Sequence, residues 1–200
     1  MLKPLLASFA LLSSVALAGT ITSPVDAMLT GATVLTFDNF AAGDYTSLQL
    51  DANVRASGQF AIGNDYAGQY NTRGAAYLDN RQGDSSSVEF HFDSPVSAVG
   101  FHWGAADSAW TLEARDSDGV ILESLTLTPT FESNEGEFFG LYVDSPSIAT
   151  LRLSTDTYDY VFVDNLTYAP GAPIPEPATT AAGFGLATLG LAYWLRRRRI

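Results

Sequence analysis

The stretch SVEFHFDSPVSAVGFHW, residues 87–103, carries the clearest structural pattern in this chain. Apolar side chains occupy alternate positions in its first half (88–92) and again in its second half (99–103), which is the period of strands with one buried face. The triplet Asp-Ser-Pro at 93–95 has the composition of a turn. We therefore predict two strands joined as a β-hairpin. The alternating apolar residues are Val88, Phe90, Phe92, Val99, Phe101 and Trp103.

Similar short runs, separated by Gly, Asp, Asn, Ser and Pro, extend from residue 32 to residue 168, and helical periodicity is nearly absent. The segment 41–86 is the least regular part and is expected to form long loops, whereas DSDG at 116–119 predicts a tight turn. About ten short strands at this spacing predict an all-β fold, an antiparallel β-sandwich or jelly roll. The further strands are expected at 33–37, 58–62, 75–78, 110–115, 120–127, 138–143, 149–154 and 160–168.

Charge is distributed very unevenly along the 200 residues. The chain has 10 Lys+Arg and 22 Asp+Glu, but between residues 19 and 170 five arginines and no lysine stand against 21 acidic residues. Phosphate binding requires clustered cationic side chains, so a nucleic-acid partner is not expected. The absence of cysteine excludes disulfides, cysteine-ligated zinc and a thiol nucleophile.

The N-terminal residues have the layout of a secretory signal peptide. A single cation precedes an apolar run, and the small residues Ala16 and Ala18 complete an Ala-x-Ala site. We predict a signal helix over 1–18 and cleavage between Ala18 and Gly19. The mature body, a β-sandwich ectodomain over 19–168, then works outside the cytoplasm.

The C-terminal segment combines a linker, an apolar span and a basic end. Residues 169–177 are rich in Pro and Gly and predict an extended linker. The 18 uncharged residues at 178–195 cover about 27 Å as a helix, close to the roughly 30 Å of a bilayer core, and predict a single transmembrane helix. Basic flanks stay in the cytoplasm, so we expect 196–200 there and the body outside. The basic residues are Arg196, Arg197, Arg198 and Arg199.

The motif Pro175-Glu176-Pro177, followed by the apolar span and the terminal arginines, resembles the PEP-CTERM sorting signal of Gram-negative bacteria. The resemblance covers residues 173–200. It implies a membrane partner and an exosortase, a membrane-embedded enzyme that recognises and cleaves such tails near Pro-Glu-Pro. It also implies export, inner-membrane anchoring before processing, and delivery to the cell envelope or extracellular matrix. The body is similar to the β-rich ectodomains that precede such tails.

Two Asp-Asn pairs mark a candidate Ca²⁺ site. Asp38-Asn39 follows the first body strand, and Asp164-Asn165 lies in the last one. If these strands are neighbours, Asp38 and Asp164 converge and the asparagines add oxygens, which is the ligand chemistry that Ca²⁺ prefers. The alternative is that each pair caps a strand end or turn through its side chain.

Aromatic residues indicate a candidate carbohydrate site, because aromatic rings stack on the apolar C–H faces of sugars. Tyr66, Tyr70 and Tyr77 fall in the loop-rich segment, and Tyr66 and Tyr70 are the predicted ligand-binding residues. Trp103 and Trp110 have strand-like apolar neighbours and are expected in the core.

No constellation typical of an enzyme is present, and an enzyme is not expected. The only histidines, His91 and His102, fall on the predicted outward faces of adjacent strands and lack a third zinc ligand at a defined spacing, so they are expected to be surface residues. The motif Gly-x-Ser-x-Gly is absent. Paired carboxylates for glycoside hydrolysis stay open, because a sequence contains no distances.

These observations favour an exported structural or adhesive protein of the cell surface or of an exopolysaccharide matrix such as a biofilm. The alternative function is a carbohydrate-binding module stabilised by calcium, with a polysaccharide as partner. A hydrolase is the third hypothesis.

Overall fold

The computed structural model describes residues 18–170, which form an all-β body with one short 3-10 helix, η1 (Ala27–Leu29). The predicted signal helix, the Pro-Glu-Pro motif, the transmembrane helix and the arginine tail lie outside these residues. Between residues 18 and 170, no helix is long and apolar enough to cross a membrane. The strands are β1 (Ala18–Ile21), β2 (Thr33–Leu35), β3 (Gly43–Gln49), β4 (Val54–Gly63), β5 (Tyr77–Asp79), β6 (Ser87–Gly104), β7 (Trp110–Arg115), β8 (Ile121–Leu127), β9 (Phe138–Val143), β10 (Ile148–Ser154) and β11 (Phe162–Pro170).

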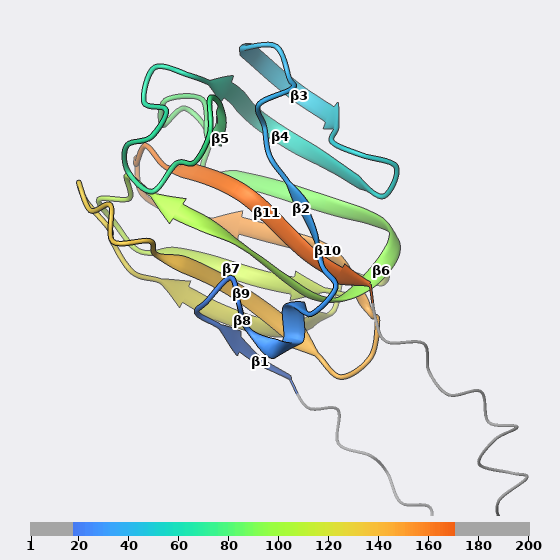
Figure 1. Cartoon of the computed structure of the whole chain (residues 1–200). Coiled ribbons are helices and arrows are strands. Elements are labelled where there is room, and N and C mark those ends of the chain that lie inside the picture. Colours follow the sequence, from blue (N-terminus) through green and yellow to red (C-terminus); the bar gives the residue numbers. More distant parts are fainter. Residues whose placement is uncertain (1–17, 171–200) are drawn as a thin grey trace, which may run out of the picture.

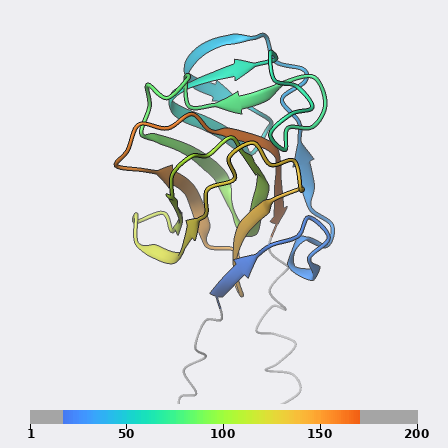
Figure 2. The same cartoon turned by 90° about the vertical axis from the view of Figure 1, so that its left-hand side faces the viewer.

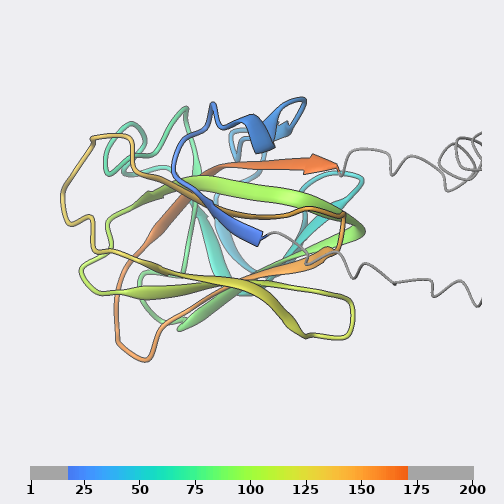
Figure 3. The same cartoon turned by 90° about the horizontal axis from the view of Figure 1, so that it is seen from below.

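The strands form two facing antiparallel layers (Figure 1). One layer has the order β3-β4-β6-β10-β7-β8, and the other has the order β2-β11-β6-β9-β1, so that β6 belongs to both. The short strand β5 pairs with both β4 and β11 and joins the layers at one end. Seen from below, the hairpin of β7 and β8 lies across from the layer that holds β9 and β11 (Figure 3). The predicted antiparallel β-sandwich is therefore confirmed.

Strand β6 shows that the predicted hairpin was wrong. Its first part (87–92) pairs with β4 and β10, and its last part (98–104) pairs with β11 and β9 in the other layer. The exposed residues Asp93, Ser94 and Pro95 carry the chain round between the layers (Figure 1). The chain reverses where its composition predicts, but the two parts do not pair with each other. Each has an apolar face, and both faces are buried when they meet across the core.

The core lies between the two layers and is rich in aromatic side chains. The alternating apolar residues of β6 are at most 5% exposed, and Trp103 meets Trp110 edge-on with ring centroids 5.7 Å apart. Burying one large apolar side chain stabilises a fold by about 1.5–3 kcal/mol, so this packing is the main source of stability. The predicted core positions of both tryptophans are confirmed.

The two ends of the sandwich differ. At the bend end, β6 reverses, Ala18 pairs with Val143 at the finish of β9, and Pro170 pairs with Val96. The described chain therefore starts and finishes at the same end (Figure 2). The opposite end, which we call the loop end, lies the length of β11 away, roughly 26 Å at 3.3 Å per residue. The connections gathered there are 64–76, 80–86, 105–109, 128–137 and 155–161.

The segment 41–86 is less irregular than predicted, because β3 and β4 occupy its first half. Strand β3 has no fully buried residue, so its sequence lacks the alternation that reveals a half-buried strand. The long loops at 64–76 and 80–86 are confirmed. Strand β1 was not predicted. It begins at Ala18, the residue after which the sequence predicts cleavage of the signal peptide.

Candidate binding site at the loop end

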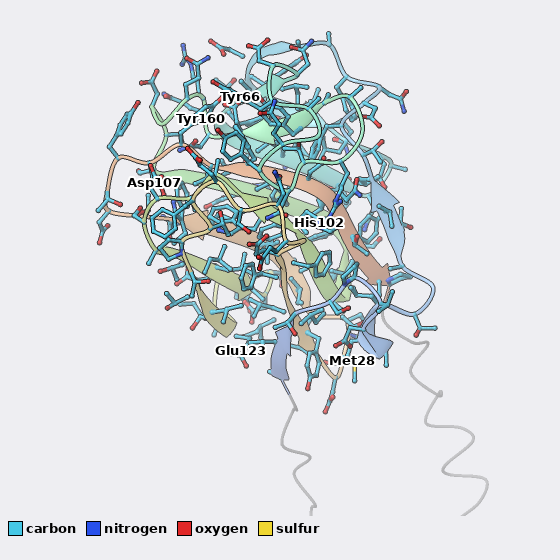
Figure 4. The ribbon with its side chains drawn as sticks, turned by 60° about the vertical axis from the view of Figure 1, so that its left-hand side comes forward. Met28, Tyr66, His102, Asp107, Glu123 and Tyr160 are labelled. Atoms are coloured by element: carbon cyan, nitrogen blue, oxygen red, sulfur yellow. The ribbon has the colours of Figure 1, made fainter. Side chains whose placement is uncertain are left out.

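A hollow with a volume of about 200 Å³ opens at the loop end, and we call it the aromatic hollow. It is smaller than the roughly 300–1,000 Å³ of pockets that take drug-sized ligands, so it fits one ring rather than an extended molecule. Tyr66, Tyr160 and Asp107 lie on this side of the body, away from the chain ends (Figure 4). The lining residues are Tyr66, Tyr70, Ala105, Asp107, Phe131, Glu132, Tyr160 and Phe162.

Three tyrosines surround a buried phenylalanine in this hollow. Tyr66 stacks on Phe162 with ring centroids 5.6 Å apart and planes at 29°, whereas Tyr70 and Tyr160 meet Phe162 at 68° and 82°. Tyr66 also stands at 76° to both other tyrosines. Phe162 is 2% exposed and Tyr66 is 39% exposed, so the floor is buried while the tyrosine rings reach solvent.

Two carboxylates, Asp107 and Glu132, add polar acceptors to the aromatic walls. Both residues are exposed, and Phe131 beside Glu132 is also 59% exposed. Within residues 18–170, neither carboxylate accepts a hydrogen bond or takes part in an ion pair. Their oxygens are therefore free for a ligand.

The buried carboxylate of Asp159 holds the connection that carries Asp107. It accepts the backbone N–H groups of Asp107 at 3.0 Å and of Ser108 at 3.1 Å, the Ser108 hydroxyl at 2.8 Å and the indole N–H of Trp110 at 2.8 Å. The indole N–H is fully buried, and a buried donor costs about 1–3 kcal/mol if it is left unpaired. Asp159 thus joins the connection before β11 to the connection before β7.

Two buried asparagines tie other connections together. Asn71 donates to the carbonyl of Trp103 at 3.0 Å and to the carboxylate of Glu137, and its side-chain oxygen accepts from the N–H of Gly136 at 2.7 Å. Asn80 donates to the carbonyl of Asp159 at 2.7 Å. These bonds link segments that are far apart along the chain, so the shape of the hollow is set before any ligand arrives.

The backbone around the hollow is strained. Tyr70, Ala105 and Phe131 all line it and have φ values of 50°, 62° and 51°, in the left-handed region that non-glycine residues rarely adopt. Gly104 is required for a different reason, because a Cβ at this position would overlap the carbonyl oxygen of Tyr70. Strain of this kind persists only where surrounding contacts enforce it, and it concentrates at binding sites.

Two buried residues of β5, Asp79 and Tyr77, lie next to Tyr160 in the wall of the hollow. Asp79 on β5 is 3% exposed, and burial raises the pKa of its carboxyl to about 6 although backbone N–H groups oppose the rise. Burial also raises the pKa of Tyr77 to about 12, while hydrogen bonds with Tyr160 and the backbone of Tyr66 lower it. Tyr160 interacts with both Asp79 and Tyr77, so these buried residues position one wall of the hollow.

The predicted calcium residues come together, as expected, because β2 pairs with β11. Asp38 accepts two backbone N–H groups of the segment 73–76 at 2.6 and 2.9 Å, and Asp164 accepts a third at 2.5 Å. Both carboxylates therefore cap this segment, which is the alternative role. Burial, opposed by these hydrogen bonds, raises the pKa of Asp164 to about 6.

Metal binding at this pair stays a prediction. In the described part of the chain, no group of three or more His, Cys, Asp or Glu side chains is arranged to hold a metal ion. The side-chain oxygen of Asn165 is buried and has no hydrogen-bond partner among residues 18–170, so one predicted ligand oxygen is open.

The two histidines lie in opposite layers although both belong to β6. His91 is on an outer face, where its Nε2 lies 2.7 Å from the hydroxyl of Ser57. His102 is half-buried with its ring 5.3 Å from Phe138, and burial lowers its pKa. The expected surface position is therefore correct for His91 and wrong for His102, which aromatic packing partly covers.

Only part of the hollow was predictable from the sequence. Of the three tyrosines considered for sugar binding, Tyr66 and Tyr70 line it, whereas Tyr77 is 1% exposed and lies in β5. The other lining residues were missed for two reasons. Four of them lie singly in irregular connections, and Tyr160 and Phe162 fall in or beside a strand that the sequence predicted at 160–168. The one local signal is an acid beside an aromatic residue, as at 131–132 and 158–160.

No known protein family model matches this chain, and no curated protein matches its sequence. Several solved structures resemble parts of it. A mutant of CBM29-2, a family 29 carbohydrate-binding module, in complex with mannohexaose has 17% identity and a TM-score of 0.43, with 70% of this chain and 92% of that chain covered.

Two further structures have comparable scores. A DUF4465 family protein from Bacteroides caccae has 11% identity and a TM-score of 0.46, with 70% of this chain and 99% of that chain covered. TmCBM61 in complex with beta-1,4-galactotriose has 16% identity and a TM-score of 0.35, with 60% and 89% covered. Likeness at this level transfers neither a ligand nor an activity to this chain.

Proposed function

We propose that the body is a carbohydrate-binding module which holds one sugar unit of a polysaccharide in the aromatic hollow. The protein then acts at the cell surface or in the matrix as an adhesive component. The observation that supports this is a rigid hollow walled by three tyrosines and flanked by two free carboxylates. This is the alternative function that the sequence raised, with Tyr66 and Tyr70 among the proposed ligand-binding residues.

The chemistry of the hollow suits a sugar ring. A pyranose has apolar C–H faces and a rim of hydroxyl groups, so it needs flat aromatic surfaces and hydrogen-bond acceptors at the edge. Tyr66 and Tyr160 supply rings, and Asp107 and Glu132 supply acceptors for hydroxyl donors. Because the connections are cross-linked in advance, binding does not have to order them, which lowers its entropic cost.

Binding without hydrolysis is the better proposal for the two carboxylates. A glycoside hydrolase needs one carboxylic acid whose pKa is raised, usually by an apolar environment, and a second carboxylate opposite it. Asp107 and Glu132 are both exposed to solvent. The buried acids at this end, Asp79, Asp159 and Asp164, do not line the hollow.

The position of the hollow fits the proposed sorting. It lies at the loop end, whereas the chain continues past Pro170 from the bend end. A PEP-CTERM tail that follows residue 170 holds the bend end toward the membrane and presents the hollow outward. Export, anchoring and exosortase processing are part of this proposal, and the motif Pro175-Glu176-Pro177 is its basis.

The binding proposal is tested on the full chain in detergent with an array of oligosaccharides. We expect retention of at least one hexasaccharide class, and loss of at least about tenfold in affinity for Tyr66→Ala and Tyr160→Ala, because each ring contributes roughly 1.4 kcal/mol or more of stacking. Tyr158→Ala is the matched control, since this tyrosine is 79% exposed and lies outside the hollow.

Equal losses in all three variants would show that binding is nonspecific, and retention of no glycan would reject the proposed function. Release of shortened products over time would instead support the hydrolase alternative.

Sorting is tested by mass spectrometry of the extracellular protein. We expect a C-terminus near the Pro-Glu-Pro motif. Recovery of an intact terminus through Trp194, Leu195 and Arg196 would reject processing and leave an anchor.

A further inference from the structure

The aromatic hollow contains acidic groups but no basic ones. Five arginines are present in residues 18–170, and none of them lines the hollow. Three are in ion pairs elsewhere, with Asp44, Glu89 and Glu113 as partners. Arg73 lies toward Gly136 and His102 instead. A ligand in the hollow therefore meets two carboxylates and no compensating cation.

The surrounding charge has the same sign. Between residues 19 and 170 the chain has 21 acidic residues and five arginines, so the body repels anionic polymers and attracts cationic ones before contact. Glu135 and Glu137 lie in the same connection as Glu132, and Asp65 precedes Tyr66. Uronic acids and sulfated or phosphorylated sugars are thus unfavourable ligands.

The tyrosine rings are also placed to attract a cation. The centroids of Tyr66 and Tyr160 are 6.4 Å apart, and those of Tyr66 and Tyr70 are 5.6 Å apart. These rings touch edge-to-face, so an ammonium group does not fit between them, but one in the corner beside them lies within about 6 Å of a ring centroid, the range in which a cation is attracted to an aromatic face. Planes at 76° form a corner, so a small group can contact two faces at once.

We infer that the hollow selects amino sugars with a free ammonium group. The tyrosine faces hold the ammonium by cation–π attraction, and Asp107 and Glu132 pair with its charge. This inference rests on the proposed carbohydrate binding and names its ligand class. A neutral sugar leaves both carboxylates without a counter-charge, whereas an ammonium sugar supplies one.

The experiment uses three β-1,4-linked hexamers that differ only at C2. These carry a hydroxyl group (cellohexaose), an acetamido group, or a free ammonium group, and binding to the full chain in detergent is measured near pH 6, where a sugar amine is protonated. We expect the ammonium hexamer to bind about tenfold or more tightly than cellohexaose. This preference should shrink when NaCl is raised from about 0.05 to about 0.5 M.

The isosteric variants Asp107→Asn and Glu132→Gln should each reduce the preference, and the double variant should reduce it further, to the part that the tyrosine rings supply. Asp118→Asn is the control, since it removes one charge at the turn between β7 and β8, at the bend end. Circular dichroism melts of all variants show whether the fold is kept.

Equal binding of the three hexamers, or tighter binding of a polyuronate, would overturn the inference and leave the proposed function standing. A preference that Asp118→Asn reduces as much as Asp107→Asn does would also overturn it, because general charge rather than the hollow would be responsible. Binding of none of the hexamers or other glycans would reject the proposed function itself.

Discussion

The loop end and the bend end connect strands of the same sandwich in different ways. At the bend end most connections are short and depend mainly on local hydrogen bonds, beside a few long-range ones from Tyr168 to Asp51 and between Asn53 and Ser94. Asp51, for example, accepts the N–H groups of Asn53 and Val54, both at 2.7 Å. At the loop end the connections are long, and Asn71, Asn80 and Asp159 bond to residues 32 to 81 positions away along the chain.

This difference has a physical meaning. A short turn closes a sandwich at little cost, whereas long connections lose more conformational entropy when they become ordered. At the loop end, left-handed backbone at Tyr70, Ala105 and Phe131 adds strain. Such costs are compatible with a surface whose shape matters, which supports the proposal of ligand binding at the loop end and attachment at the bend end.

Among variants at the two ends, Asp159→Ala at the loop end should cause the largest loss of stability. This change leaves the buried indole N–H of Trp110 and the partly buried N–H groups of Asp107 and Ser108 without their acceptor, so we expect the free energy of unfolding to fall by roughly 3 kcal/mol. At the bend end, Asp116→Ala removes an acceptor for two exposed N–H groups and should cost about 1 kcal/mol. Urea denaturation followed by tryptophan fluorescence measures both, and equal losses would contradict the distinction.

A glycine at each end gives the second test. Gly104→Ala forces the backbone of Tyr70 to move, so we expect a loss of about 1–3 kcal/mol in stability together with loss of ligand binding. Gly119 has φ +80° and open space around it, so Gly119→Ala should cost about 1 kcal/mol for its conformation and leave binding intact. Binding retained in Gly104→Ala would show that the position of Tyr70 is unimportant.

Acid titration gives an intermediate effect. The pKa values of Asp79 and Asp164 are raised to about 6 in the folded protein, because burial disfavours their charged forms. Between about pH 4 and pH 6 the unfolded chain has released protons that the folded chain still holds, so stability falls as the pH rises through this window. We expect a contribution on the order of 1–3 kcal/mol from each group.

The measurement is the free energy of unfolding from urea curves at several pH values. Asp79→Asn should remove its share of the slope between pH 4 and pH 6, whereas Asp118→Asn at the exposed turn should leave the slope unchanged. A slope that persists in full in Asp79→Asn would contradict the assignment.

The smallest effect concerns the predicted calcium pair. If Ca²⁺ joins Asp38 and Asp164, a tenfold excess over its dissociation constant adds about 1.4 kcal/mol, a rise of roughly 3–6 °C in melting temperature. A chelator should reverse this rise, and Asp38→Asn should abolish it. A melting temperature that does not respond to CaCl2 would leave both carboxylates with their capping role.

Much of the fold was predictable because a half-buried strand leaves a period of two in its own sequence. The strands β7 and β9 occupy the predicted residues, and the alternating residues of β6 are in the core. Strand β3 was not predictable in this way, since its side chains are largely exposed. Tyr66 and Tyr70 were identified as aromatic residues in a loop-rich segment. Asp107 carried no local signal, and Glu132 and Tyr160 carried only that of an acid beside an aromatic residue.

The alternation of apolar and polar residues along 87–103 shows that one face of each strand is buried. This can be recognised from the sequence without knowing the rest of the molecule. It does not report which surface covers that face. The reversal at 93–95 therefore predicted a hairpin, while the chain instead crosses between layers and lets the two faces cover each other. The aromatic hollow likewise exists only after folding, because its walls come from residues 66 to 162 and meet through long-range hydrogen bonds.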